Sequence, residues 1–97
     1  MSAISLLNET LQNKWSFETT MKIQDEMIPA MVEGKDIVAE SPTGSGKTLA
    51  YTLPILNKVD GKKKQTQALI VAPSQELAMQ IVEVIRDWTV GTDITVQ

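Results

Sequence analysis

The chain has 97 residues, a formal net charge of −3, and neither cysteine nor histidine. This composition excludes disulfides, thiol nucleophiles and Cys/His zinc sites from the segment, and its acidic balance argues against RNA binding by bulk electrostatics. The longest apolar run, residues 68–72, is too short to cross a bilayer. The first residues lack the pattern of a signal peptide, so we expect a cytoplasmic protein.

The first third of the chain predicts helices. Residues 3–14 form an expected amphipathic helix, because apolar side chains recur every three or four positions at Ile4, Leu7, Leu11 and Trp15. A second helical segment follows, with apolar side chains at Ile23, Met27 and Met31. We expect Pro29 to break this segment and start a short second piece, and Gly34 to end it.

The remainder alternates between expected strands and helices. Short apolar or β-prone stretches at 36–40, 68–72 and 92–97 predict strands, and the segments 47–58 and 75–88 predict helices, Pro54 lying within the first and Ser74 capping the second. Strands that alternate with helices imply right-handed crossovers and a parallel sheet flanked by helices, an α/β fold. We divide the chain into N-terminal helices, 1–34, and the first strands and helices of a larger domain, 35–97.

A candidate phosphate-binding loop stands between the first expected strand and its helix, at Ser41, Pro42, Thr43, Gly44, Ser45, Gly46, Lys47 and Thr48. Glycines allow the backbone to curl so that several N–H groups face one phosphate, and the start of the next helix adds attraction for an anion. Lys47 would reach the β and γ phosphates of ATP, and the Thr48 hydroxyl would bind Mg²⁺. A glycine-containing loop without a ligand is the alternative interpretation.

Three stretches together resemble the DEAD-box ATP-dependent RNA helicases. The loop 41–48 is similar to motif I of that family, in which alanine usually takes the place of Ser41. Phe17 and Gln24 are spaced like the aromatic residue and glutamine of the Q motif, although Thr20-Met21 replaces its usual Pro-Thr and Leu7 replaces its upstream aromatic. Residues 72–80 resemble motif Ia, with Gln75 in place of the usual arginine.

The resemblance implies a RecA-like P-loop NTPase fold and a set of roles. Gln24 would pair with the N6 and N7 edge of adenine and Phe17 would stack on its face, although Phe17 is equally suited to anchor a core. The loop and helix start at Pro73, Ser74, Gln75 and Glu76 would bind RNA phosphates without regard to base sequence. Trp15 and Trp88 lie on apolar stripes and are interpreted as core residues, and Lys62 to Lys64 as a solvated loop.

Hydrolysis and unwinding need residues that the resemblance locates beyond Gln97, in the acidic D-E-A-D motif and in a second RecA-like domain. We therefore interpret the chain as a truncated first domain, inactive by itself, whose exposed sheet edge favours self-association. Two other classes stay open. One is a different P-loop NTPase, such as a DNA helicase or nucleotide kinase, and the other is a nucleotide-binding module without catalysis.

Overall fold

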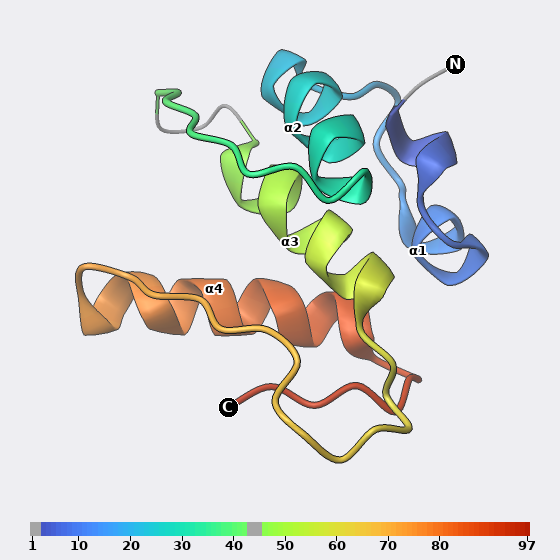
Figure 1. The fold of residues 1–97 in the computed structure, drawn as a ribbon, viewed down its shortest axis with the longest axis vertical. Coiled ribbons are helices and arrows are strands. Elements are labelled where there is room, and N and C mark those ends of the chain that lie inside the picture. The colour runs from blue at the N-terminus through green and yellow to red at the C-terminus, as the bar shows by residue number, and fades with distance from the viewer. Residues whose placement is uncertain (1–2, 43–45) are drawn as a thin grey trace. The chain divides into compact units, whose positions relative to one another are not determined.

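A computed structural model of the chain describes residues 3–42 and 46–97, which divide by packing into two units, one ending at Lys58 and one beginning at Val59. The first unit contains a 3-10 helix, η1 (Ala3–Leu6), and three α-helices, α1 (Glu9–Lys14), α2 (Lys22–Val32) and α3 (Lys47–Lys58) (Figure 1). The second contains α4 (Gln75–Thr89). None of the helices in the described ranges combines the length and apolar character that a membrane span requires.

Asn8 divides the N-terminal segment, so the prediction of one helix over 3–14 is wrong. Its backbone is extended, and its side chain accepts a hydrogen bond of 3.0 Å from the Leu11 N–H, which starts α1 as a new helix. Asparagine favours this capping position over a helix interior. The Asn8 N–H also donates to Asn57 Oδ1 at 2.6 Å, which fastens the start of α1 to the last turn of α3.

Helix α2 continues through Pro29, so the predicted break is wrong. A proline inside a helix removes its own N–H bond, but the Pro29 carbonyl still accepts from the Glu33 N–H at 3.1 Å. Ile28, beside the proline, is fully buried where α2 packs on α3. Burying a large apolar side chain contributes about 1.5–3 kcal/mol, which offsets much of the cost of about 3 kcal/mol for an interior proline.

Gly34 ends α2, as predicted. Its φ angle is +86°, a conformation that side chains other than glycine rarely adopt. The Gly34 N–H donates to the Met31 carbonyl and the Lys35 N–H to the Ala30 carbonyl, each at 3.0 Å. These two bonds form the Schellman arrangement that closes a helix C-terminus, and they turn the chain back toward the phosphate loop.

Helix α3 has the predicted bounds and contributes Ala50, Leu53 and Leu56 to the core of the first unit. Its inward face packs against α2, and Pro54 lies inside it without interrupting it. The fully buried Thr52 satisfies its hydroxyl by donating to the Thr48 carbonyl at 2.7 Å, one turn back. The apolar core of this unit consists of Ala3, Ile4, Leu7, Leu11, Ile23, Ile28, Ala50, Leu53 and Leu56.

Helix α4 forms the second unit together with the segments on either side of it. The Ser74 side chain accepts from the Leu77 N–H at 3.1 Å, so Ser74 caps the helix as predicted. Ile81, Ile85 and Thr89 recur at four-residue spacing and form the buried face of the helix. In the same unit Gly61 lies directly against the backbone of residues 93 and 94, where a Cβ atom would come within 2.8 Å of the Ile94 nitrogen.

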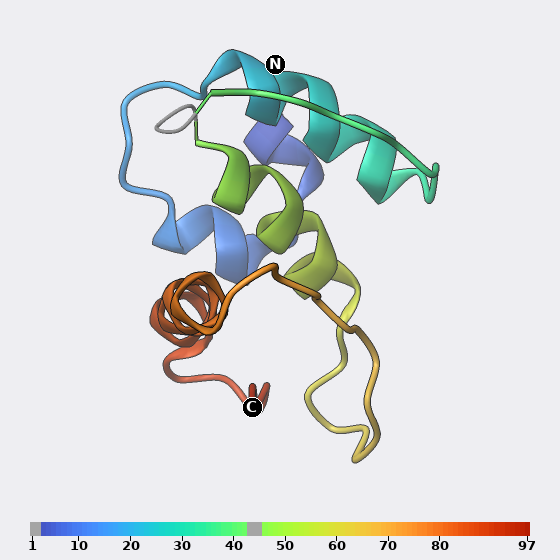
Figure 2. The ribbon, with the colours of Figure 1, turned by 90° about the vertical axis from the view of Figure 1, so that its left-hand side faces the viewer.

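The predicted sheet is not observed. No strand occurs in the described ranges, including the three predicted segments 36–40, 68–72 and 92–97. Residues 36–40 instead run as an irregular segment from the end of α2 toward the start of α3 (Figure 2). Val38 is 99% exposed and Leu69 and Val71 are more than 80% exposed. A parallel strand is stable only when neighbours pair with it and helices cover both faces, and these segments lack that cover within the described chain.

The packing of α3 generates a stability prediction. Leu53 is fully buried, so Leu53→Ala should lower the free energy of unfolding by about 2–5 kcal/mol because it leaves a cavity. Leu6 is 46% exposed, and Leu6→Ala serves as the matched control with an expected loss below about 1 kcal/mol. Urea unfolding of the 97-residue chain, followed by helical circular dichroism, measures both. Equal losses for the two variants would contradict the assigned core.

Candidate nucleotide-binding site

The start of α3 carries the predicted phosphate-binding residues. Gly46 has a φ angle of +81° and its carbonyl accepts from the Ala50 N–H, so the helix begins directly at this glycine. Lys47 and Thr48 occupy the first turn, where free N–H groups and the helix dipole favour an anion. The site therefore presents positive potential at the point where the sequence predicts phosphate.

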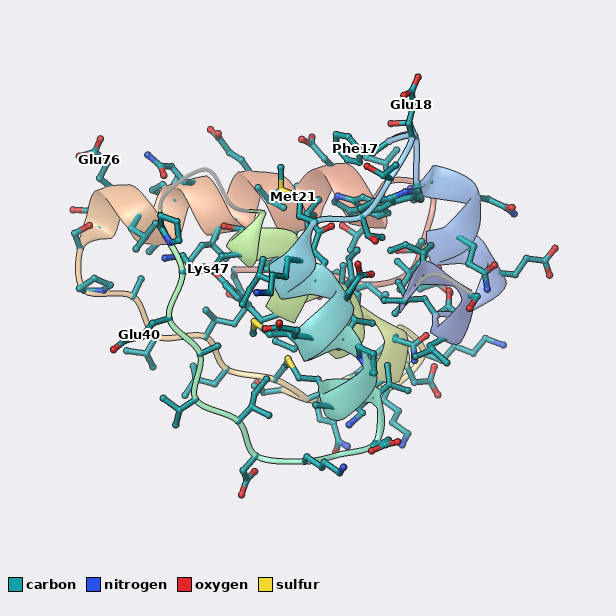
Figure 3. All side chains as sticks on the ribbon, turned by 90° about the horizontal axis from the view of Figure 1, so that it is seen from above. Phe17, Glu18, Met21, Glu40, Lys47 and Glu76 are labelled. Atoms are coloured by element: carbon teal, nitrogen blue, oxygen red, sulfur yellow. The ribbon has the colours of Figure 1, made fainter. Side chains whose placement is uncertain are left out.

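Lys47 turns back across the loop. Its exposed ammonium group donates to the Ser41 carbonyl at 3.1 Å, and Figure 3 shows the side chain beside the segment that carries Glu40. Because Lys47 and Ser41 stand at opposite ends of the predicted loop, this bond brings the ends of the loop together. A carbonyl is a weaker partner for an ammonium group than a phosphate oxygen, so the bond can be exchanged for a bound polyphosphate.

Gln24 joins α2 to the phosphate loop. Its side chain is 3% exposed, its Nε2 donates to the Gly46 carbonyl at 3.2 Å and its Oε1 accepts from the Met21 N–H at 2.9 Å. The Gln24 side chain is therefore buried and bonded at both ends of its carboxamide within the protein. Among the described contacts, one N–H and one lone pair of its carboxamide are engaged, whereas a carboxamide has two of each.

Met21 packs against Gly46, a contact that the sequence did not reveal. A Cβ atom on Gly46 would lie 2.7 Å from the Met21 sulfur and 2.6 Å from Gln24 Nε2, so both side chains occupy the space that glycine leaves open. Met21 also begins α2 without a side-chain cap, and the carboxamide of Gln24 takes that role by accepting the Met21 N–H. A flexible thioether can fill such an irregular gap.

Phe17 lies on the connector between α1 and α2, close in sequence to this site (Figure 3). It is 56% exposed, which excludes the core role and leaves its ring accessible to a ligand. Its neighbour Trp15 is half-buried, and the two ring centroids are 4.9 Å apart. Phe17 and Met21 are four residues apart, so their Cα atoms are separated by no more than about 14 Å.

The middle of the predicted loop, Thr43, Gly44 and Ser45, lies outside the described residues. Pro42 before it is exposed, and Thr48 after it is half-buried. No group of three His, Cys, Asp or Glu side chains that could hold a metal ion occurs in the described ranges, and the predicted Mg²⁺ ligand Thr48 would supply a single oxygen. This fits Mg²⁺, which keeps several waters and is usually held by few protein groups together with substrate phosphates.

The residues assigned to RNA lie in the second unit. Pro73, Ser74, Gln75 and Glu76 are all exposed, and they form the entry to α4. The first turn of a helix leaves N–H groups without intrahelical partners. In α4, the Ser74 side-chain oxygen accepts one of them, the Leu77 N–H. The Glu76 carboxylate favours the helix start but repels a phosphate, so the predicted contact with RNA would depend on the backbone.

Comparison with known proteins identifies the family of the chain. The model of the family described as DEAD/DEAH box helicase matches residues 21–97, which include Gln24, the phosphate loop and the entry to α4. The chain belongs to the DEAD/DEAH box helicase family. The family match implies a RecA-like fold for the domain that contains this segment.

Individual members of the family are similar over most of the chain. The "Probable ATP-dependent RNA helicase YfmL" of Bacillus subtilis is 45% identical over 87 residues, or 87% of this chain. The "DEAD-box ATP-dependent RNA helicase CshC" of Bacillus cereus is 48% identical over 88 residues, or 88% of the chain. The "ATP-dependent RNA helicase CshA" of Listeria monocytogenes is 46% identical over 71 residues. The chain spans 23% of the length of each of the first two relatives.

The contact at Gly46 predicts a specific sensitivity. Gly46→Ala would combine the strain of a positive φ angle with a clash against Gln24 and Met21, so ATP affinity should fall about tenfold or more. Gly91 has the same φ angle of +81° but nothing within 4 Å of the position of a Cβ atom. Gly91→Ala is thus a control for the strain alone.

Isothermal titration with ATP measures the difference between these two variants in the intact protein. We expect Gly91→Ala to bind ATP like the wild type. Equal affinities of the two variants would show that the packing of Gln24 and Met21 on Gly46 is irrelevant to the nucleotide site.

Proposed function

We propose that this chain forms the ATP-binding part of an ATP-dependent RNA helicase. The observation that carries the proposal is the hydrogen bond of Gln24 to the Gly46 carbonyl. It joins a helix that carries the predicted base-recognition residue to the loop that carries the predicted phosphate-binding residues.

The phosphate end of ATP would lie at the start of α3. Lys47 would exchange its bond to the Ser41 carbonyl for the β and γ phosphates, and the N–H groups of the first turn would add further donors. Thr48 would supply one ligand to Mg²⁺, which neutralises phosphate charge when it is bound. The backbone of Ser41 to Gly46 would surround the phosphates.

The base end would lie between α2 and the connector before it. The second N–H and the second lone pair of Gln24 match the N7 acceptor and the N6 donor of adenine. Because Gln24 also holds the Gly46 carbonyl, a bound base and the phosphate loop would act on the same side chain. Phe17, with more than half of its surface exposed, would stack on the base.

RNA would bind at the entry to α4, where the backbone from Pro73 to Glu76 is exposed. Contacts of backbone N–H groups with phosphates carry no sequence information, so this segment would bind RNA of any sequence. Strand separation would then follow from closure of this domain on a second RecA-like domain when ATP binds. The names of the relatives, which describe ATP-dependent RNA helicases, support this reaction class.

Replacement of Lys47 tests the proposal. In the intact protein, Lys47→Ala should weaken ATP binding by about 10- to 100-fold, because a hydrogen bond to a charged group contributes about 1.5–3 kcal/mol, and should abolish RNA-stimulated ATP turnover. Lys35→Ala is the control, since Lys35 is exposed and pairs only with Glu33 among the described contacts. The proposal would be refuted if Lys47→Ala turned over ATP as fast as the wild-type protein. If RNA did not stimulate ATP turnover by the wild-type protein, another P-loop NTPase would be favoured.

Gln24→Ala tests the link between base and phosphate loop. The change removes the bonds to Met21 and Gly46 together with the two hydrogen bonds proposed to adenine. ATP affinity should fall about tenfold, as expected for the loss of two ligand hydrogen bonds of about 0.5–1.5 kcal/mol each. Gln12→Ala is a matched control, because Gln12 Nε2 also donates to a backbone carbonyl, that of Leu7, at 2.6 Å. Fluorescence titration with a labelled ATP analogue measures both variants, and equal affinities would defeat the role assigned to Gln24.

A further inference from the structure

Two aromatic rings meet at the end of α1. The centroids of Trp15 and Phe17 are 4.9 Å apart and the ring planes are inclined by 63°, an edge-to-face arrangement. Phe17 is 56% exposed, so Trp15 covers only part of its surface. Both residues precede the region 21–97 that matches the family model.

Trp15 is held more firmly than Phe17. It is the residue that ends α1, and its N–H donates to the Gln12 carbonyl at 3.2 Å. Helix α1 is anchored in turn, because Leu11 is buried and the Asn8 N–H bonds to Asn57 on α3. Phe17 lies outside any helix, so its ring is restrained by what it contacts.

Helix α3 links this aromatic pair to the phosphate loop. Its first residue is Lys47, and its last turn holds Asn57, the partner of Asn8. Twelve residues of α-helix span about 18 Å. Helix α1, which Trp15 caps, and the end of the predicted phosphate loop are therefore both joined to α3 within the first unit.

We infer that Trp15 is a positioning residue for the adenine base: it holds the Phe17 ring in one orientation and leaves the rest of that ring open for stacking. The inference rests on the proposed ATP site and adds a residue to it. An exposed phenylalanine on a connector loses rotamer freedom when a ligand stacks on it. A ring already fixed by an edge-to-face contact loses less, so the base binds more tightly.

The test separates the base from the phosphates. Trp15→Ala, in the intact protein, should weaken ATP binding roughly three- to tenfold, the range expected for the loss of one aromatic pair. Binding of inorganic tripolyphosphate, which has phosphates but no base, should not change. Trp15→Phe keeps an aromatic edge next to Phe17 and should restore most of the ATP affinity. Trp88→Phe, on α4, controls for tryptophan replacement elsewhere.

Fluorescence provides a second measurement. Addition of ATP changes the tryptophan emission of the protein if a ligand contacts a ring next to a tryptophan. Any such change that is absent from Trp15→Phe is assigned to Trp15. We expect such a change with ATP and none with tripolyphosphate, because only the base would contact the ring that Trp15 touches. A merely structural tryptophan would respond to neither ligand or equally to both.

Three results would overturn the inference. If Trp15→Ala weakens ATP and tripolyphosphate equally, Trp15 supports the fold and not the base. If it changes neither while Phe17→Ala weakens ATP, Phe17 stacks without help from Trp15, and the proposed function stands. If Phe17→Ala also leaves ATP binding unchanged, the pair is no part of the base site, and the Lys47 variant alone decides the proposed function.

Discussion

The hydrogen bond between the Gln24 carboxamide and the Gly46 carbonyl connects the parts of this site. Without it, the start of α2 and the start of α3 would be joined near the loop only by packing. The bond is possible because Gly46 has no Cβ atom, which would otherwise clash with the amide nitrogen at 2.6 Å. The conformational freedom of this glycine thus serves two purposes, since it turns the loop and admits the side chain that holds the loop.

The same carboxamide explains how the chain tolerates its departure from the Q motif. Met21 replaces a threonine, and its side chain provides no cap for α2. The Gln24 oxygen accepts the Met21 N–H instead, and the Thr20 hydroxyl donates to the Asp25 carboxylate at 2.6 Å one turn further on. The start of α2 is therefore fixed by polar groups other than the usual one, and the thioether is left to pack on Gly46.

Sequence reasoning succeeded where local chemistry decides the structure. The bounds of α3, the cap at Ser74 and the left-handed turn at Gly34 follow from residue types within a few positions. It failed where tertiary packing decides. Burial of Ile28, on a helix that packs against α3, offsets much of the cost of Pro29 inside α2, and the bond from Asn8 to Asn57, 49 residues later, fixes the start of α1. No local pattern contains either interaction.

The predicted sheet also depends on contacts between residues distant in sequence. Residues 36–40 and 68–72 have the composition of buried strands, and the family match implies a RecA-like fold, yet Val38 and Leu69 are exposed and unpaired with a neighbouring strand in the described chain. Strand formation depends on partners distant in sequence, whereas a helix satisfies its own backbone. The described part of the candidate nucleotide site lies mainly at helix starts, at Met21 and Gly46, so the contacts between Gln24, Met21 and Gly46 form between α2 and α3 without a sheet.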